Sequence, residues 1–328
     1  MAPLTLPSSL AEAIAEESAR LPLASLIEAA QSLSRSYRRE NGALPAILND
    51  AGRAAYLATR FPATYAAITV ALSELARTVD TQSLRTLIDV GAGPGTATLA
   101  ALALIPSISL VRQVERDRGW LAIAARLSTS VTADVTNERR DLRSMDTTAH
   151  DLVVAAYALN ELPESERDAT VLRLWAASQQ ALVVVEPGTP DGFAIVRRVR
   201  ELCLEQGGHA AAPCTHNAFC PMTRDDWCHR TARVTRSALH RRLKDAQLAY
   251  EDEKFSYVAM TRQAPRRLSP GRIVRRPIRA GGHVHLDLCT AAGLERSTVT
   301  RSDRQNYKAA RDADWGDLWP TPTGDASE

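Results

Sequence analysis

Three of the five cysteines lie within fifteen residues, at Cys214, Cys220 and Cys228, and Cys289 follows 61 residues later. The cysteine ligands of zinc knuckles and ribbons come in pairs about two to four residues apart, and the chain contains no such pair. The wider spacing favours a [4Fe–4S] cluster, because the ligands of a cluster need not come from one tight turn. The remaining thiol, Cys203, falls on the apolar face of a predicted helix and is expected in the core.

Two alternatives remain for the clustered thiols. Zinc could be held by three cysteines and one histidine, or the thiols could be incidental members of a metal-free loop. A loop rich in Gly, Ala and Pro gains little on folding to offset its ordering entropy, so the metal-free loop is the weaker alternative. The candidate histidine ligands are His209, His216 and His229.

A second stretch with chemical potential is residues 87–99 (LIDVGAGPGTATL), where a short apolar run ends in a turn with three glycines. An Ala/Leu-rich helical pattern follows, so the stretch predicts the strand, turn and helix of an open α/β nucleotide-binding unit. The helix N-terminus would offer free N–H groups to polar ligand atoms. The third glycine comes one residue too early for a dinucleotide fingerprint, and no phosphate-cradling G-x-x-x-x-G-K-[ST] pattern occurs. Residues 89–95, in the form D-x-G-x-G-x-G, resemble motif I of the class I S-adenosylmethionine-dependent methyltransferases.

Acidic residues at two further positions fit such a cofactor. Glu115 ends a predicted strand 20 residues after Gly95, the distance at which an acid reaches ribose hydroxyls in such folds. Asp141 stands near the usual adenine contact, with Asp134 and Asp146 competing for that role. The expected cofactor-binding residues are Asp89, Gly91, Ala92, Gly93, Glu115 and Asp141.

Methyl transfer also needs residues that align an acceptor, and the sequence offers few candidates for this role. After the buried strand predicted at residues 151–159, the candidates are Tyr157, Asn160 and Glu161. Enzymes that methylate exocyclic base nitrogens often carry an Asp/Asn-Pro-Pro-aromatic signature at this place, whereas residues 155–157 are Ala-Ala-Tyr, and no cysteine lies there as a nucleophile. An S-adenosylmethionine-dependent rRNA methyltransferase and a catalytically inactive RNA-binding assembly factor with a structural metal both remain open.

The order of elements predicts an α/β fold, a Rossmann-like class I methyltransferase sheet with three attachments. Residues 1–80 are expected to form an N-terminal helical region, residues 81–262 the core, and residues 263–328 a basic, β-rich C-terminal extension. A Cys-rich insertion is expected at residues 207–230. Within these regions, helices are expected at 8–19, 23–37, 62–79, 96–104, 120–127, 164–178, 191–205 and 230–246. Strands are expected to end at residue 90 and to span 108–114, 129–135, 151–159, 181–185, 254–262 and 283–289.

Charge is unevenly distributed along the chain. The net charge is only +2, but residues 230–280 hold 14 Lys/Arg against 4 Asp/Glu, whereas residues 87–205 hold 12 against 16. Such asymmetry indicates a polyanionic partner, here RNA. Arg233, Arg236, His240 and Lys244 would share one face of the helix predicted at 230–246, and residues 262–279 add seven arginines and no acid. The expected RNA contacts are Arg233, Arg236, Lys244, Arg266, Arg267, Arg275 and Arg276.

The sequence also bears on location. No apolar run reaches the roughly 18 residues that a membrane helix needs, so no membrane contact is expected. The N-terminus carries Glu12, Glu16 and Glu17 and has no apolar signal segment, which predicts a cytoplasmic protein. A monomer is expected.

Ten segments together resemble the methyltransferase-like assembly proteins of the mitochondrial small ribosomal subunit and their bacterial relatives. The segments are motif I and residues 60–65 (RFPATY), 156–162 (AYALNEL), 185–190 (VEPGTP), 212–216 (APCTH), 219–221 (FCP), 226–229 (DWCH), 250–257 (YEDEKFSY), 286–289 (LDLC) and 315–320 (WGDLWP). The resemblance spans about residues 55 to 320. It implies a class I methyltransferase fold and binding to small-subunit rRNA or a ribosome precursor. It also implies a [4Fe–4S] cluster on Cys214, Cys220, Cys228 and Cys289, and a bacterial cytoplasmic member fits best.

Overall fold

A computed structural model describes residues 3–39, 49–223, 226–266 and 269–321. Its larger sheet has the order β3-β2-β1-β4-β5-β8-β6, with β7 also paired to β8. The first five strands are parallel, and β8 (Tyr250–Thr261) runs antiparallel to its neighbour β5. The parallel strands are β1 (Thr86–Val90), β2 (Leu110–Glu115), β3 (Asp134–Arg139), β4 (His150–Ala156) and β5 (Ser178–Pro187). This is a Rossmann-like class I methyltransferase sheet, so the predicted fold class is confirmed.

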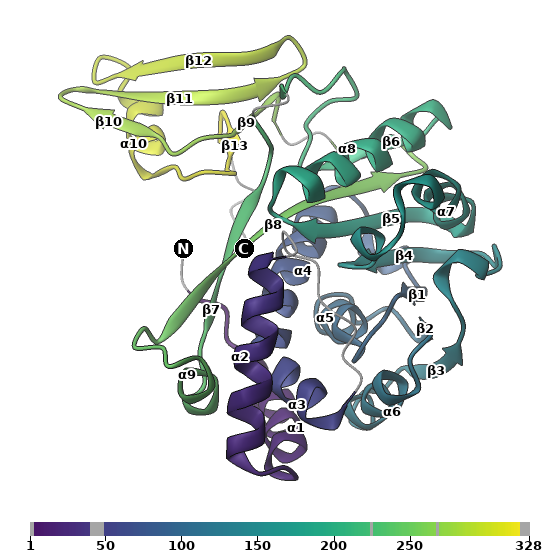
Figure 1. Ribbon diagram of the computed structural model, residues 1–328. Helices are drawn as coiled ribbons and strands as arrows, with labels where there is room; N and C mark the ends of the chain where they lie inside the picture. Colours follow the sequence, from purple (N-terminus) through teal and green to yellow (C-terminus); the bar gives the residue numbers. More distant parts are fainter. Residues whose placement is uncertain (1–2, 40–48, 224–225, 267–268, 322–328) are drawn as a thin grey trace.

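Helices cover both faces of this sheet (Figure 1). Residues 152–155 of β4 and 181–185 of β5 are apolar and buried on both sides, as parallel strands between helical layers require. One face carries α4 (Phe61–Ala76), α5 (Thr96–Leu104) and α6 (Arg118–Leu127) in one hydrophobic cluster. The other face carries α7 (Glu164–Ala177) and α8 (Pro190–Glu205), with Cys203 buried as expected.

The N-terminal helices belong to the first of these clusters. They are α1 (Ser8–Ala19), α2 (Leu23–Arg39) and α3 (Asp50–Thr59). Helix α3 was not predicted, because Asn41, Gly42 and Pro45 indicated a break without showing where the chain resumes a helix. Asn49 caps it by accepting a hydrogen bond from the Gly52 N–H at 2.7 Å. Its residues Gly52 to Thr59 are buried, so α3 is part of the core.

The helix predicted at 230–246 is wrong over its first half. Residues Arg230–Thr235 form β7, which pairs with β8 along six positions, and only Ala238–Lys244 form a helix, α9. Thr231, Val234 and Thr235 are β-branched, and the long neighbouring strand supplies the hydrogen bonds that complete a ladder. The Cys-rich insertion likewise contains a short strand, β6 (His209–Ala212), and the third parallel strand lies later than the predicted 129–135.

A second, five-stranded sheet follows β8 and lies above the first in Figure 1. Its central antiparallel pair is β11 (His283–Thr290) and β12 (Gly293–Thr300). The others are β9 (Gly271–Ile273), β10 (Ile278–Ala280) and β13 (Leu318–Trp319), with α10 (Arg304–Asp312) packed against the pair. This sheet has its own apolar core. Short 3-10 turns lie at η1 (Thr81–Ser83), η2 (Leu142–Ser144) and η3 (Leu159–Glu161). Within the described residues, no helix has the length and apolar character needed to cross a bilayer.

Candidate functional site

A cavity of about 510 Å³ opens at the carboxyl ends of β1, β2 and β4. Ligands bind at this edge in open α/β sheets because the loops there diverge to either side. The cavity is lined by all six residues that the sequence predicts for the cofactor: Asp89, Gly91, Ala92, Gly93, Glu115 and Asp141. Cofactor binding by these residues remains a prediction.

The glycine turn has the geometry that the sequence pattern requires. Gly93 has φ +53°, and a Cβ atom added to it would meet no atom within 4 Å, so its backbone faces open space in the cavity. Gly95 has φ +80°, and a Cβ atom there would lie 2.7 Å from the Gln113 amide nitrogen. Gly93 therefore leaves room for a ligand, whereas Gly95 leaves room for the neighbouring strand.

Two acids fix the elements around the turn, Asp89 through α5 and Glu115 through Gly93. Asp89 is buried, and its Oδ2 accepts hydrogen bonds from the N–H and the hydroxyl of Thr98; burial raises its pKa to about 6. Glu115 accepts hydrogen bonds from the Gly93 N–H at 3.0 Å and the Asp117 N–H at 2.8 Å. A carboxylate offers about four acceptor positions, so Glu115 retains capacity for ligand hydroxyls.

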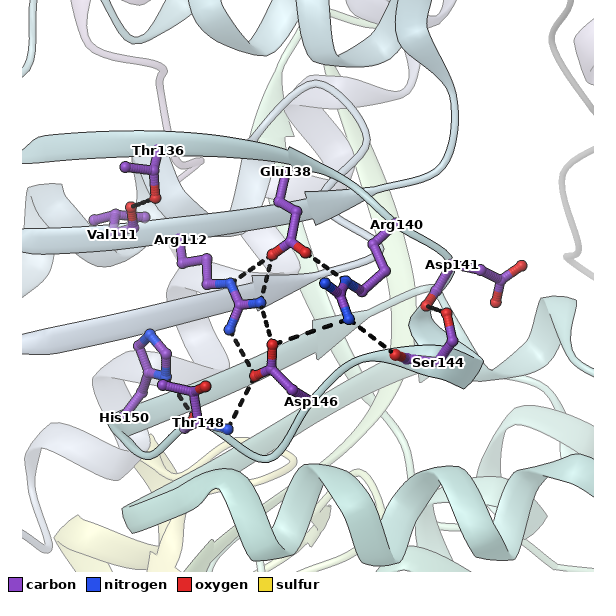
Figure 2. A network of polar contacts seen from close by, with 10 residues as sticks. All are labelled: Val111, Arg112, Thr136, Glu138, Arg140, Asp141, Ser144, Asp146, Thr148 and His150. Carbon is purple, nitrogen blue, oxygen red and sulfur yellow. Dashed lines mark hydrogen bonds and ion pairs between the residues drawn. The ribbon is translucent and has the colours of Figure 1, made fainter.

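The structure separates the three acids proposed for the adenine contact. Asp141 lines the cavity, and its hydrogen bonds with Arg143 lower its pKa to about 2. Asp146 does not line the cavity and instead joins Arg112, Glu138 and Arg140 in an ion-pair network (Figure 2). The third acid, Asp134, is exposed at the start of β3 and does not line the cavity.

The catalytic candidates are only partly gathered at the cavity. Tyr157 and Glu161 line it, and Asn160 does not. Tyr157 has φ +54°, and its hydroxyl donates a hydrogen bond to Glu253 at 3.2 Å. Glu161 keeps two fifths of its side chain exposed, but its position in the cavity raises its pKa to about 6 through partial desolvation. Glu161 is therefore the candidate that can change protonation near neutral pH.

Residues from α3, α4 and α6 complete the wall, and the sequence did not predict them. Tyr56, Thr64 and Trp120 line the cavity, with the Tyr56 and Trp120 rings 5.2 Å apart, edge to face. Arg53 donates hydrogen bonds to both carboxylate oxygens of Asp117, and a Cβ atom on Gly119 would lie 2.2 Å from its guanidinium carbon. The segment RFPATY was the available signal for part of this wall.

A second, smaller cavity of about 50 Å³ gathers the four clustered thiols. Cys214, Cys220, Cys228 and Cys289 all line it, although they come from the loop after β6, the segment before β7 and strand β11. His216 is buried, with its Nε2 3.6 Å from the Cys289 sulfur. Among the described residues, no three His, Cys, Asp or Glu side chains form a group that could hold one metal ion.

The predicted basic face on a helix does not exist. Arg233 lies on β7 and forms a two-point ion pair with Asp252, and Arg236 pairs with Glu251. Glu251 also binds Lys244 at 2.8 Å and His240 at 2.9 Å, and His240 is 1% exposed. The acids of β8 lie beside these cations because β7 and β8 are paired, with Arg233 opposite Asp252. The helix predicted at 230–246 would not have had this pairing.

The arginines of the basic segment at 262–279 are in different surroundings. Arg275 forms an ion pair with Asp226. Arg266 and Arg276 are exposed, and Arg267 lies outside the described residues. RNA contact by the predicted set remains a prediction, for which Arg266 and Arg276 are the best placed members.

Comparisons with known proteins show what the chain is similar to. The human mitochondrial ribosome assembly protein METTL17 is 29% identical over 83% of this chain and 63% of its own length. The Rsm22-cox11 tandem protein 2 of Schizosaccharomyces pombe is 25% identical over 81% of this chain and 43% of its own length. The chain thus spans less than two thirds of the curated relatives it matches. Among solved structures, the Synechocystis magnesium protoporphyrin IX methyltransferase with bound SAH is 14% identical with a TM-score of 0.41, covering 71% of this chain and 100% of that chain.

These relatives correct the expected location. Both are named as mitochondrial proteins, which contradicts the cytoplasmic location expected from the acidic N-terminus. The composition of the first residues was therefore a poor guide. A family model described as mitochondrial small ribosomal subunit Rsm22 matches residues 51–320, and the chain belongs to this family.

Proposed function

We propose that this chain binds S-adenosylmethionine in the larger cavity and acts in small-ribosomal-subunit assembly by binding rRNA. The observation that carries the proposal is the convergence of all six predicted cofactor residues on one cavity at the carboxyl edge of a methyltransferase sheet. Glu115 would bind the ribose hydroxyls, Asp141 the adenine, and the backbone at Gly93 the amino acid part. When bound, the cofactor supplies a methyl group on a positively charged sulfur.

Calorimetry with S-adenosylmethionine and with its demethylated product tests this binding. Gly93→Val places a side chain in open cavity space and is expected to abolish the heat of binding. Gly207→Val is the matched control, because Gly207 also has positive φ and open space around its Cβ position but does not line the cavity. Wild-type protein without a heat of binding or a thermal shift would refute cofactor binding.

Methyl transfer is the second part of the proposal, and Glu161 is its candidate acid–base group. Its raised pKa would let it accept a proton from an acceptor nitrogen or oxygen near neutral pH. A methyl-transfer assay on small-subunit rRNA, comparing wild type with Glu161→Gln, measures this role. Loss of transfer with retained cofactor binding supports catalysis.

A binding protein without methyl transfer is the competing function, and one observation favours it. The hydroxyl of Tyr157 donates to Glu253, which is itself paired with Arg60, so this proton is already engaged in a structural ion pair. Wild-type protein that binds cofactor and rRNA but transfers no methyl group would establish the competing function.

The smaller cavity fits a metal–thiolate centre. Four thiols from distant segments line one cavity, together with the apolar side chains of Phe193, Met222 and Val274. The four cysteines include no pair two to four residues apart, as zinc knuckles and ribbons use, whereas cluster cysteines bind separate irons and need not come from one tight turn. We therefore favour a [4Fe–4S] cluster over zinc, and such a cluster would tie the loop to β11 covalently.

Iron and acid-labile sulfide in anaerobically purified protein measure this centre. Cys220→Ser is expected to lower iron content, and Cys203→Ser is the matched control, because Cys203 is buried away from the cavity. Stoichiometric zinc without visible absorption would contradict the cluster.

Binding to rRNA rests on the family and on the exposed cations. One relative is named as a ribosome assembly protein, and the family is described as belonging to the small ribosomal subunit. Arg266 and Arg276 are exposed at the surface. Phosphate contacts make affinity fall steeply as salt rises. The double variant Arg266→Glu/Arg276→Glu is expected to bind small-subunit rRNA at least tenfold more weakly at moderate salt. Arg20→Glu/Arg35→Glu, which changes two exposed charges outside the family match, is the control.

A further inference from the structure

Cationic side chains surround the cysteine cavity. Four arginines line it together with the four thiols, and none of its described lining residues is acidic. Two of these arginines are deeply buried, with Arg200 4% exposed and Arg272 6% exposed. Burying a charge is costly unless a partner compensates it, so the partners of each arginine decide how much negative charge the cavity calls for.

Arg200, on α8, is the less compensated of the two. Its Nη2 donates hydrogen bonds to the carbonyl oxygens of His216 at 3.0 Å and Ala218 at 2.6 Å. Its described hydrogen bonds thus go to neutral carbonyls. Its Nε is buried and has no hydrogen-bond partner in the described part of the chain. Arg200 therefore brings a positive charge and a free N–H donor to the wall of the thiol cavity.

Arg272, on β9, stands directly opposite Cys289 in the antiparallel ladder. Its Nη1 donates to the Gly316 carbonyl and its Nη2 to Glu74, each at 2.7 Å. These two bonds fix the guanidinium in place. Its Nε, like that of Arg200, is buried without a hydrogen-bond partner among the described residues.

We infer that Arg200 and Arg272 provide the counter-charge and two N–H donors for an anionic metal–thiolate centre held by the four cysteines. The inference rests on the metal centre proposed above. Metal-bound thiolates carry net negative charge and accept hydrogen bonds at sulfur, and such bonds raise a centre's reduction potential. The two arginines thus act through the ligands, as positioning residues that set potential and metal retention.

The test uses the full chain, purified anaerobically, with two readouts. The midpoint potential is measured by dithionite titration, and metal release to a chelator is followed in time. Arg200→Gln is expected to shift the potential to a more negative value and to speed metal release severalfold, because the centre loses a positive charge and a donor. Arg198→Gln is the matched control on the same helix, since Arg198 is exposed and pairs with Asp168. Arg200→Lys keeps the charge without the Nε–H donor and should fall between wild type and Arg200→Gln.

The outcomes separate the inference from the metal centre itself. Metal-loaded wild type with unchanged potential and release rate in Arg200→Gln overturns the inference and leaves the centre standing. Wild type that holds no metal after anaerobic reconstitution overturns both. If the glutamine variant does not fold, wild-type behaviour of Arg200→Lys in both readouts overturns the inference.

Discussion

Arg60 and Glu253, 193 residues apart in the chain, form a two-point ion pair in the protein interior. The Arg60 Nη1 and Nη2 donate to the two carboxylate oxygens of Glu253 at 3.1 and 2.9 Å, and both side chains are under a tenth exposed. The Tyr157 hydroxyl also donates to Glu253. Together these three residues join the start of α4, the carboxyl end of β4 and strand β8. Each belongs to one of the segments on which the family resemblance rests, residues 60–65, 156–162 and 250–257.

Removing one partner of this pair should be costly. Glu253→Ala leaves the Arg60 charge buried without its carboxylate, and a loss of about 3–5 kcal/mol in the free energy of unfolding is expected. Urea denaturation measures it. Asp252→Ala, at the next position of β8, breaks the exposed pair with Arg233 and should cost about 1 kcal/mol or less. Equal losses in the two variants would show that the buried Arg60–Glu253 pair contributes no more to the free energy of unfolding than an exposed pair.

Glu186 should make stability depend on pH. It is fully buried, its Oε1 accepts the Leu159 N–H at 2.9 Å, and burial raises its pKa to about 8 from an ordinary 4.5. Between these values the unfolded chain has lost the proton that the folded chain keeps, so the free energy of unfolding falls as pH rises. Glu186→Gln removes the ionisable group. This variant is expected to be more stable than wild type by about 4 kcal/mol at pH 8, and by little at pH 4.5.

Denaturation curves at several pH values give the Glu186 difference directly. Glu12→Gln, an exposed position on α1, serves as the control and should follow the wild-type pH profile. A constant difference between Glu186→Gln and wild type from pH 4.5 to 8 would contradict the raised pKa.

Gly316 supports the arginines beside the cysteine cavity. Its φ is +90°, its carbonyl accepts hydrogen bonds from Arg230 and Arg272, and a Cβ atom would lie 2.3 Å from the Arg230 guanidinium carbon. Gly316→Ala should therefore combine backbone strain with displacement of Arg230. Gly282→Ala has nearly the same φ, +92°, with its closest atom at 3.9 Å, so it isolates the strain of about 1–2 kcal/mol.

Thermal unfolding compares the two glycine variants. The Gly316 variant is expected to have the lower Tm and to lose metal faster, because the Cβ atom displaces Arg230, which shares the Gly316 carbonyl with Arg272. Matching Tm values and metal contents in the two variants would show that the close approach to Arg230 carries no weight.

Arg53 is expected to control access to the larger cavity. It holds α3 against the loop after β2 through Asp117, and its guanidinium lies 5.9 Å from the centre of the Trp120 ring. Arg53→Met should weaken S-adenosylmethionine binding by about tenfold, since the wall formed by Tyr56 and Trp120 loses its anchor. Calorimetry measures this change, with Arg20→Met, at the exposed residue that follows α1, as the control. Unchanged affinity in Arg53→Met would show that the ion pair does not order the wall.

The sequence alone determined the features that depend on local pattern. The turn at residues 91–95 needs positive φ at three positions, which only glycine adopts freely, so its place could be predicted. The strands β4 and β5 contain unbroken apolar runs at residues 152–156 and 181–185, and α5 begins and ends where its helical pattern does. The four cysteines that line the smaller cavity could be singled out because thiols are few and their spacing is unusual.

Only the tertiary structure decided the features that depend on distant partners. Residues 230–235 form a strand because β8 supplies its hydrogen bonds, and the same pairing brings Asp252 and Glu251 against Arg233 and Arg236. Of the three acids near the adenine position, folding placed Asp141 in the cavity and took Asp146 into a pair with Arg112. Distant partners outweigh local helix or strand preference because they supply the hydrogen bonds of a strand. They also determine whether a side chain is buried and whether its charge is paired.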